Sequence, residues 1–127
     1  GDLLPEIFLL AAGCGLVIDT LLVLNNYRDR TTDRVAGKHT LIVIFGERFG
    51  SLFYLGQGII GCALVSGAFA FNGQWSAMLP LLYIPFHIAT WREMVEIHQG
   101  RALNKILGKT SRNMILLTLL IILAAFL

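Results

Sequence analysis

Three side chains that can bind a metal ion recur every fourth residue in a polar segment after the first long apolar stretch. They are Asn25, Asp29 and Asp33. On a helix this spacing keeps them within about 80° of one face, where they form a row of oxygen ligands. Carboxylates one turn apart repel each other, so a divalent cation would offset the cost of placing them there. Mg²⁺ suits this set, because it takes one or two carboxylates together with phosphate oxygens and water.

Basic residues are interleaved with this row. Arg28 precedes Asp29, and Lys38 follows Gly37, which supplies a flexible turn. Cationic side chains at such positions can bind the phosphate oxygens that a metal ion leaves free. The segment therefore indicates a site for Mg²⁺ and a diphosphate. A solvated loop that only sets membrane topology is the alternative, and the spacing alone does not decide between the two.

A further carboxylate, Asp19, lies inside the first apolar stretch. A carboxylate at the centre of a membrane span costs roughly 2.5 to 3.5 kcal/mol, so it must face a cavity or a polar partner. On a helix Asp19 projects on the same side as Asn26, about 100° from Asn25. We expect Asp19 to line a cavity, with a structural hydrogen bond as the alternative.

The elements that must position these residues are membrane helices. Hydrophobic residues make up 56% of the 127 residues and charged residues 14%, whereas ordinary soluble domains carry about 25% charged residues. Since a span needs about 20 apolar residues, we predict an all-α, polytopic transmembrane bundle in one domain. The predicted spans are residues 3–27, 50–71, 76–96 and 112–127.

The basic residues predict how these spans are oriented. All ten Lys and Arg side chains fall in two clusters, one after the first predicted span and one after the third. The connection between the second and third spans has none. By the positive-inside rule both clusters are cytoplasmic, and so is the aspartate-rich segment. The net charge of +2 thus follows from topology and gives no reason to expect a nucleic-acid partner.

Several residues inside the spans have structural explanations. Pro80 and Pro85 should kink the third span, because each removes a backbone donor. His87 fits a packing role better than a ligand role. A stripe of small residues in the second span should let a neighbouring helix approach closely. Its members are Gly58, Cys62, Ser66 and Ala70.

The complete string from residue 25 to residue 41 is more specific than its spacing. N-N-x-R-D-x-x-x-D-x-x-x-G-K-x-T-L resembles the second aspartate-rich motif of the UbiA superfamily of intramembrane prenyltransferases. The version found here is similar to that of the bacterial branch acting on 1,4-dihydroxy-2-naphthoate. Residues 100–112 also resemble the loop before that family's last helix, so the resemblance covers essentially the whole chain. The fixed motif positions are Asn25, Asn26, Arg28, Asp29, Asp33, Gly37, Lys38, Thr40 and Leu41.

The resemblance implies a nine-helix fold around a central cavity, of which this chain would supply the last four helices. It also implies a reaction in which Mg²⁺ and cationic side chains neutralise the departing diphosphate of a polyprenyl donor. The naphthoate ring then attacks the prenyl carbon and loses its carboxylate as carbon dioxide, giving demethylmenaquinone in its reduced, hydroquinone form. Such an enzyme would reside in the lipid bilayer of the bacterial inner membrane.

The resemblance also implies roles for individual residues. Asp29 and Asp33 would be metal ligands, with Asn25 as a supporting ligand or hydrogen-bond donor. Arg28, Lys38 and Asn26 would bind the diphosphate, although no separate contribution of Asn26 follows from the motif. The family's first aspartate-rich motif does not occur in these residues. We therefore expect the chain to need the N-terminal remainder of the enzyme and to be inactive alone.

Three other functions stay open on the sequence. One is a UbiA-type enzyme with another aromatic acceptor. The second is a CDP-alcohol phosphotransferase, whose D-x-x-D-G-x-x-A-R signature is absent. The third is a membrane transporter or structural subunit, in which Asp19 would couple ions and the motif would be a topology signal.

Overall fold

The computed structural model describes residues 4–70 and 75–126. Within these residues the chain is helical and contains no strand, which confirms the predicted all-α class. Predicted features that fall on residues 3, 71–74 and 127 lie outside the described part, including most of the connection between the second and third predicted spans. The elements are α1 (Leu4–Arg28), α2 (Arg30–Val35), α3 (Leu41–Phe45), α4 (Glu47–Ala70), η1 (Trp75–Met78), η2 (Pro80–Leu82), α5 (Tyr83–Ile97), η3 (Arg101–Leu103) and α6 (Asn104–Phe126).

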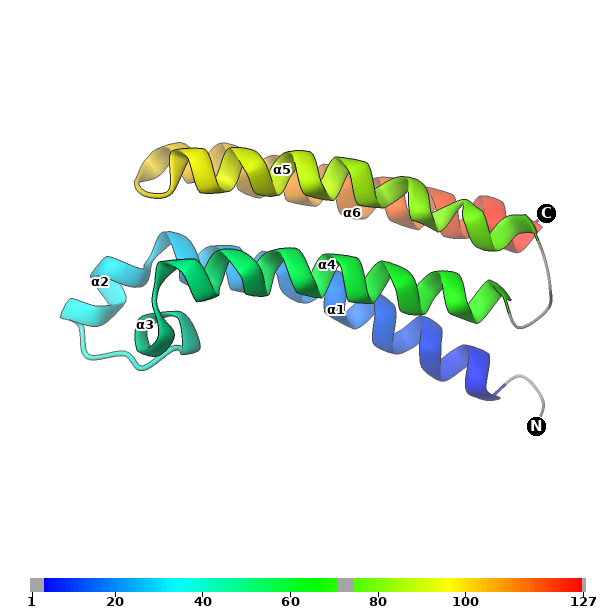
Figure 1. Ribbon diagram of the computed structural model, residues 1–127, viewed down its shortest axis with the longest axis horizontal. Coiled ribbons are helices and arrows are strands. Elements are labelled where there is room, and N and C mark those ends of the chain that lie inside the picture. The colour runs from blue at the N-terminus through cyan, green and yellow to red at the C-terminus, as the bar shows by residue number, and fades with distance from the viewer. Residues whose placement is uncertain (1–3, 71–74, 127) are drawn as a thin grey trace.

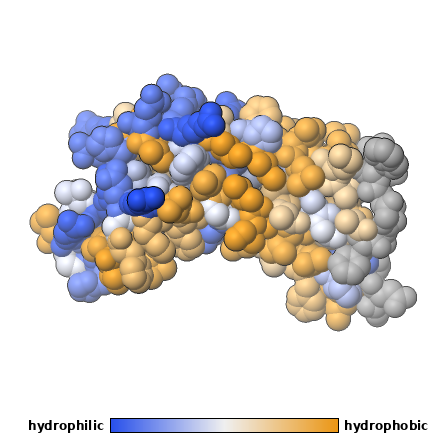
Figure 2. All heavy atoms as spheres, in the orientation of Figure 1, coloured by the Kyte–Doolittle hydropathy of each residue, from blue (hydrophilic) through white to orange (hydrophobic). Residues whose placement is uncertain are grey.

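The long helices form two pairs that pack against each other. α1 lies along α4, which is the most extensive contact in the molecule, and α5 lies along α6. The short helices α2 and α3 and the α5–α6 connection lie at one end of the bundle, whereas the start of α1 and the end of α6 lie at the other (Figure 1). Hydrophilic residues gather at the end that carries α2 and α3, and the rest of the visible surface is mainly hydrophobic (Figure 2).

Three helical segments among the described residues are long and apolar enough to cross a membrane. They are Leu4–Arg28, Glu47–Ala70 and Arg101–Phe126. Large hydrophobic side chains are exposed along their sides, where lipid would cover them. Together these features support a membrane protein. Examples of such exposed side chains are Phe8, Ile18, Leu22, Ile60, Ile115 and Leu119.

The third predicted span, residues 76–96, is not one continuous helix. It consists of the short 3₁₀ turns η1 and η2 followed by α5, which has 15 residues. Pro80 begins η2, and Pro85 lies in the first turn of α5, where a missing backbone N–H costs least. Pro80 and Pro85 thus lie near the starts of η2 and α5, and that this segment crosses a membrane stays a prediction.

The last helix begins earlier than predicted. α6 starts at Asn104, so residues 104–112 form its first turns. The family resemblance had placed these residues in a loop. Gly100 adopts φ +90°, a conformation that L side chains rarely adopt, and it marks the turn before η3. Three basic residues thus stand on a helix and not in a flexible loop, namely Lys105, Lys109 and Arg112.

The buried packing explains the small and aromatic residues of α4. Gly61 lies against Gly13 of α1, and a Cβ atom on Gly61 would be 2.7 Å from the Gly13 carbonyl oxygen. Gly58 faces the other way, toward the imidazole of His87. That imidazole is buried between Tyr54 and Tyr83, with ring centroids 4.8 and 5.3 Å away. His87 is therefore a packing residue, as the sequence indicated.

Candidate active site

The predicted row of oxygen ligands crosses a break between two helices. α1 ends at Arg28, Asp29 has φ −92° and ψ 6°, and α2 starts at Arg30. The backbone N–H of Asp29 still donates to the Asn25 carbonyl at 3.0 Å, and that of Asp33 donates to the Asp29 carbonyl at 2.7 Å. Because these bonds keep the four-residue spacing, the row survives the break, although it does not lie on a single helix.

Asp29 is held by its neighbour in sequence. The Arg28 guanidinium donates through Nε to Oδ1 at 2.9 Å and through a terminal nitrogen to Oδ2 at 3.3 Å. This interaction lowers the pKa of the Asp29 carboxyl below its ordinary value, so the group stays ionised near neutral pH. Arg28 also donates to Oδ1 of Asn104 at 2.8 Å. The motif is thereby tied to the start of α6.

A tight turn places Lys38 beside Asp33. The backbone N–H of Lys38 donates to the Asp33 carbonyl at 2.9 Å, and Gly37 between them has φ +81°. The Lys38 ammonium lies 4.0 Å from Oδ1 of Asp33. Its side chain is 70% exposed, whereas that of Asp33 is 14% exposed. The carboxylate is thus turned into the protein, while the ammonium stays accessible to a ligand.

The end of the motif starts the next helix. The Thr40 hydroxyl accepts a hydrogen bond from the Val43 N–H at 3.2 Å, which makes Thr40 the N-cap of α3. Leu41 is the first residue of that helix. The Gly-Lys-x-Thr-Leu part of the motif is therefore a turn followed by a helix cap, and it folds the chain back beside the aspartates.

Asp19 and Asn26 lie apart from the row but line one cavity. Its volume is about 250 Å³, and its wall includes Thr40, the N-cap of α3, and Leu41 and Ile42 of that helix. Asn25, Asp29 and Asp33 are not among the described residues that line it. The structure therefore places the predicted cavity-lining residue and Asn26 in one pocket, next to the element that the motif caps.

A polar cluster around the buried Arg30 side chain, which the motif did not reveal, supports this region. The Arg30 guanidinium donates to the carbonyl oxygens of Tyr27 and His98, and it lies 3.5 Å from Oε1 of Glu47. It also lies over the Tyr27 ring, 4.5 Å from the centroid. Glu47 accepts a hydrogen bond from the Tyr27 hydroxyl at 3.3 Å. The only signal in the sequence is the spacing of Tyr27 and Arg30, since the other partners come from distant segments.

The donor set fits Mg²⁺. Asp29, Asp33 and Asn25 offer oxygen atoms alone, with two carboxylates, and this is the protein contribution that Mg²⁺ uses when phosphate and water complete the shell. Within residues 4–70 and 75–126 no group of three or more His, Cys, Asp or Glu side chains could hold a metal ion. The described chain therefore offers part of a coordination shell, which a ligand or other protein residues would have to complete.

A sequence comparison shows which enzyme the chain is similar to. The chain is 31% identical to the 1,4-dihydroxy-2-naphthoate octaprenyltransferase of Escherichia coli (strain K12), over an alignment that covers 98% of the chain. The similarity is thus to a UbiA-type prenyltransferase. This confirms the resemblance carried by the aspartate-rich motif. The chain spans 41% of that enzyme's length. No family model and no solved structure matches the chain.

Proposed function

We propose that the protein containing this chain transfers a polyprenyl group from a polyprenyl diphosphate to 1,4-dihydroxy-2-naphthoate, in menaquinone biosynthesis. The observation that carries the proposal is the motif itself, which keeps Asp29, Asp33 and Lys38 together at the hydrophilic end of a bundle of apolar helices. The related enzyme from Escherichia coli bears the name of this activity.

In this proposal the motif residues bind the diphosphate end of the donor. Asp29 and Asp33, with Asn25, would hold Mg²⁺, which when bound neutralises charge on the diphosphate. Arg28 keeps Asp29 ionised, so the carboxylate is ready for a cation at neutral pH. Lys38, which is exposed beside Asp33, would bind an oxygen of the same diphosphate. Asn26 faces the neighbouring cavity together with Asp19.

The reaction follows from this placement of charge. The allylic C–O bond of the donor breaks and its electron pair leaves with the diphosphate oxygen, where the cationic side chains stabilise the negative charge. The ring carbon that carries the carboxylate of the acceptor bonds to the prenyl carbon, and the carboxylate leaves as carbon dioxide. The isoprenoid tail would lie among the apolar helices, which exclude water from the electrophilic carbon.

The location of the protein follows from the same proposal. Both basic clusters belong to segments at the α2–α3 end of the bundle, because α2, α3 and the α5–α6 connection lie there (Figure 1). By the positive-inside rule this end faces the cytoplasm of a bacterial inner membrane. The donor and the acceptor would then reach the aspartates from the cytoplasmic side.

Conservative substitutions test the function. In the intact protein, Asp29→Asn and Asp33→Asn should each lower Mg²⁺-dependent prenyl transfer by about 100-fold or more, because electrostatic stabilisation of the leaving group is lost. Transfer is measured with a polyprenyl diphosphate and radiolabelled 1,4-dihydroxy-2-naphthoate. Glu96→Gln is the matched control, since Glu96 is an exposed carboxylate outside the motif.

Two results would overturn the proposal. The first is unchanged transfer in both aspartate variants, which would make the motif a topology signal. The second is a protein that uses another aromatic acid and ignores the naphthoate in a panel of acceptors. That result would keep a UbiA-type prenyltransferase and replace the acceptor.

A further inference from the structure

A groove between α5 and α6 lies outside the candidate active site. It has a volume of about 530 Å³ and combines an apolar wall with three cationic side chains. α5 supplies most of the wall, and α6 supplies two of the cations. The apolar members are Ile84, Pro85, Ile88 and Ala89, and the cationic members are Arg92, Lys109 and Arg112.

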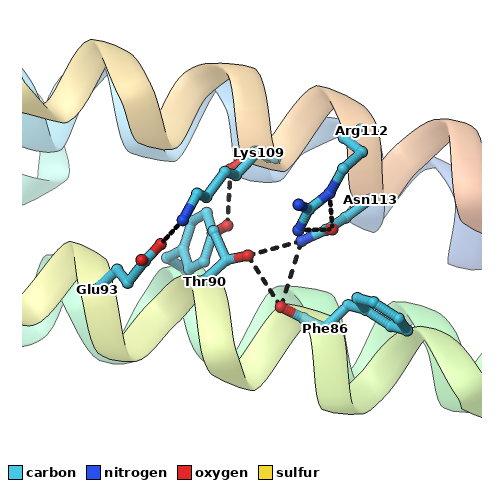
Figure 3. Close-up of polar contacts among 8 residues, drawn as sticks. Phe86, Thr90, Glu93, Lys109, Arg112 and Asn113 are labelled. Carbon is cyan, nitrogen blue, oxygen red and sulfur yellow. Dashed lines mark hydrogen bonds and ion pairs between the residues drawn. The ribbon is translucent and has the colours of Figure 1, made fainter.

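A chain of hydrogen bonds fixes one of these cations in place. The Arg112 guanidinium donates to Oδ1 of Asn113, at 3.4 Å from Nε and 3.1 Å from a terminal nitrogen. Asn113 is buried, and its Nδ2 donates to the Thr90 hydroxyl at 2.8 Å and to the Phe86 carbonyl at 3.4 Å (Figure 3). The hydrogen-bond partner of Arg112 is a neutral amide, so its guanidinium is oriented without forming an ion pair.

The groove as a whole has an excess of positive charge. Lys109 forms an ion pair with Glu93 across the two helices (Figure 3). Glu93 is the single carboxylate among the described residues that line the groove. Arg92 lines the same wall and has no ion-pair or hydrogen-bond partner among the described residues. Among the described residues, Arg92 and Arg112 thus form no ion pair, and one carboxylate faces three cations.

The cations lie toward the hydrophilic end of the bundle, which is the end that lipid headgroups would meet. Arg112 is two turns into α6 from Asn104, a rise of about 12 Å from the hydrophilic end of the bundle. Below it the groove continues along apolar side chains of α5. A free phosphate ion would use the cations but not the apolar wall. A molecule that carries both a phosphate and a hydrocarbon chain matches both parts.

We propose that the groove binds an anionic phospholipid. Its phosphodiester would accept hydrogen bonds from Arg112 and Arg92, since guanidinium groups bind phosphate oxygens in a planar, two-pronged geometry. An acyl chain would lie along Ile84 and Ile88. Basic pockets between membrane helices bind anionic headgroups in this way. The inference depends on the membrane location of the helices and not on the prenyl-transfer activity.

The test uses the intact protein in vesicles of equal parts phosphatidylglycerol and phosphatidylcholine. Native mass spectrometry then gives the ratio of the two lipids that stay bound. The wild-type protein should favour phosphatidylglycerol. In the double variant Arg92→Gln, Arg112→Gln the ratio of bound phosphatidylglycerol to phosphatidylcholine should fall by about fivefold for each cation removed. The double variant Arg101→Gln, Lys105→Gln removes the same charge outside the groove and should keep the preference.

The Glu93→Gln variant distinguishes a loss of lipid binding in the groove from a loss of the folded structure. This change removes the carboxylate that neutralises Lys109, so the preference for phosphatidylglycerol should rise. A misfolded protein cannot produce that gain. The proposal is overturned if Glu93→Gln leaves the ratio unchanged, or if both double variants lower it equally. It is also overturned if inorganic phosphate at millimolar concentration displaces the bound lipid, which would make the groove a site for a free anion.

Discussion

Arg30 holds the aspartate-rich motif against the rest of the bundle. Its side chain is nearly buried and contacts groups from three separate segments, namely the end of α1, the start of α4 and the last turn of α5. Since Arg30 directly follows Asp29, these contacts also fix the position of the carboxylate. Arg30 is therefore a positioning residue, because it reaches the proposed ligand only through its neighbour.

Replacing this guanidinium should destabilise the protein. Arg30→Ala leaves two carbonyl oxygens and Glu47 without their donor, which should lower the free energy of unfolding by about 1.5 to 3 kcal/mol. Arg34→Ala is the matched control, because Arg34 is exposed on the same helix. Unfolding in mixed micelles measures both variants. Equal stability of the two would show that the buried contacts of Arg30 contribute nothing.

Arg30 should also affect catalysis apart from stability. In Arg30→Lys the charge is kept, but an ammonium cannot reach both carbonyls and Glu47 with the same geometry. We expect a lower kcat together with a higher Mg²⁺ concentration for half-maximal activity. A merely structural residue would change the amount of folded enzyme and leave the Mg²⁺ dependence as it was.

At the scale of elements, the packing of α1 against α4 depends on a close approach of their two backbones. Gly13 and Gly61 meet backbone to backbone, and a Cβ atom on either would come within 2.5 to 2.7 Å of the other's carbonyl oxygen. Small residues at a helix crossing allow such contact in a membrane, where apolar side chains gain little from leaving lipid. The crossing sets the direction of α1 and thereby the position of the aspartate-rich motif at its end.

A methyl group at this crossing should separate the helices. Gly61→Ala is expected to cost about 1 to 3 kcal/mol of stability, because the added atom meets backbone that cannot move aside locally. Gly56→Ala, on the same helix, meets no atom within 4 Å and should be neutral or slightly stabilising. Unfolding in mixed micelles compares the two. A Gly61 variant as stable as the Gly56 variant would contradict the close crossing.

At the scale of the whole molecule, the proposed chemistry is concentrated at one end. The motif, the cap of α3 and the α5–α6 turn lie together, and hydrogen bonds from Arg28 to Asn104 and from Arg30 to His98 connect them. The described residues supply one row of oxygen ligands, and the chain spans 41% of its relative. The rest of a coordination shell would have to come from outside this chain.

This division predicts that the chain is inactive by itself. Residues 1–127, expressed alone in membranes, should show no Mg²⁺-dependent prenyl transfer above background. Transfer should appear when the N-terminal remainder of the enzyme is produced beside it as a separate chain. Asp29→Asn in the shorter piece should abolish that recovery. Activity of residues 1–127 alone would prove this prediction wrong.

The sequence by itself determined the helical class, the membrane character and the identity of the motif. Composition and the length of apolar runs are enough for the first two, because lipid forces backbone groups to pair within each helix. The motif could be read because its residues are contiguous, so their spacing survives in any fold that keeps the local turns. The same locality explains why Lys38 was expected beside the row of oxygen ligands, where it lies near Asp33.

Only the tertiary structure decided the features that depend on remote partners. The hydrogen bond from Arg28 to Asn104 and the cluster around Arg30 depend on contacts between distant segments. The same holds for the glycine crossing and for the groove beside Arg112. The periodicity of apolar residues in a sequence describes one helix at a time. The free energy of packing depends on which other helix lies against that helix.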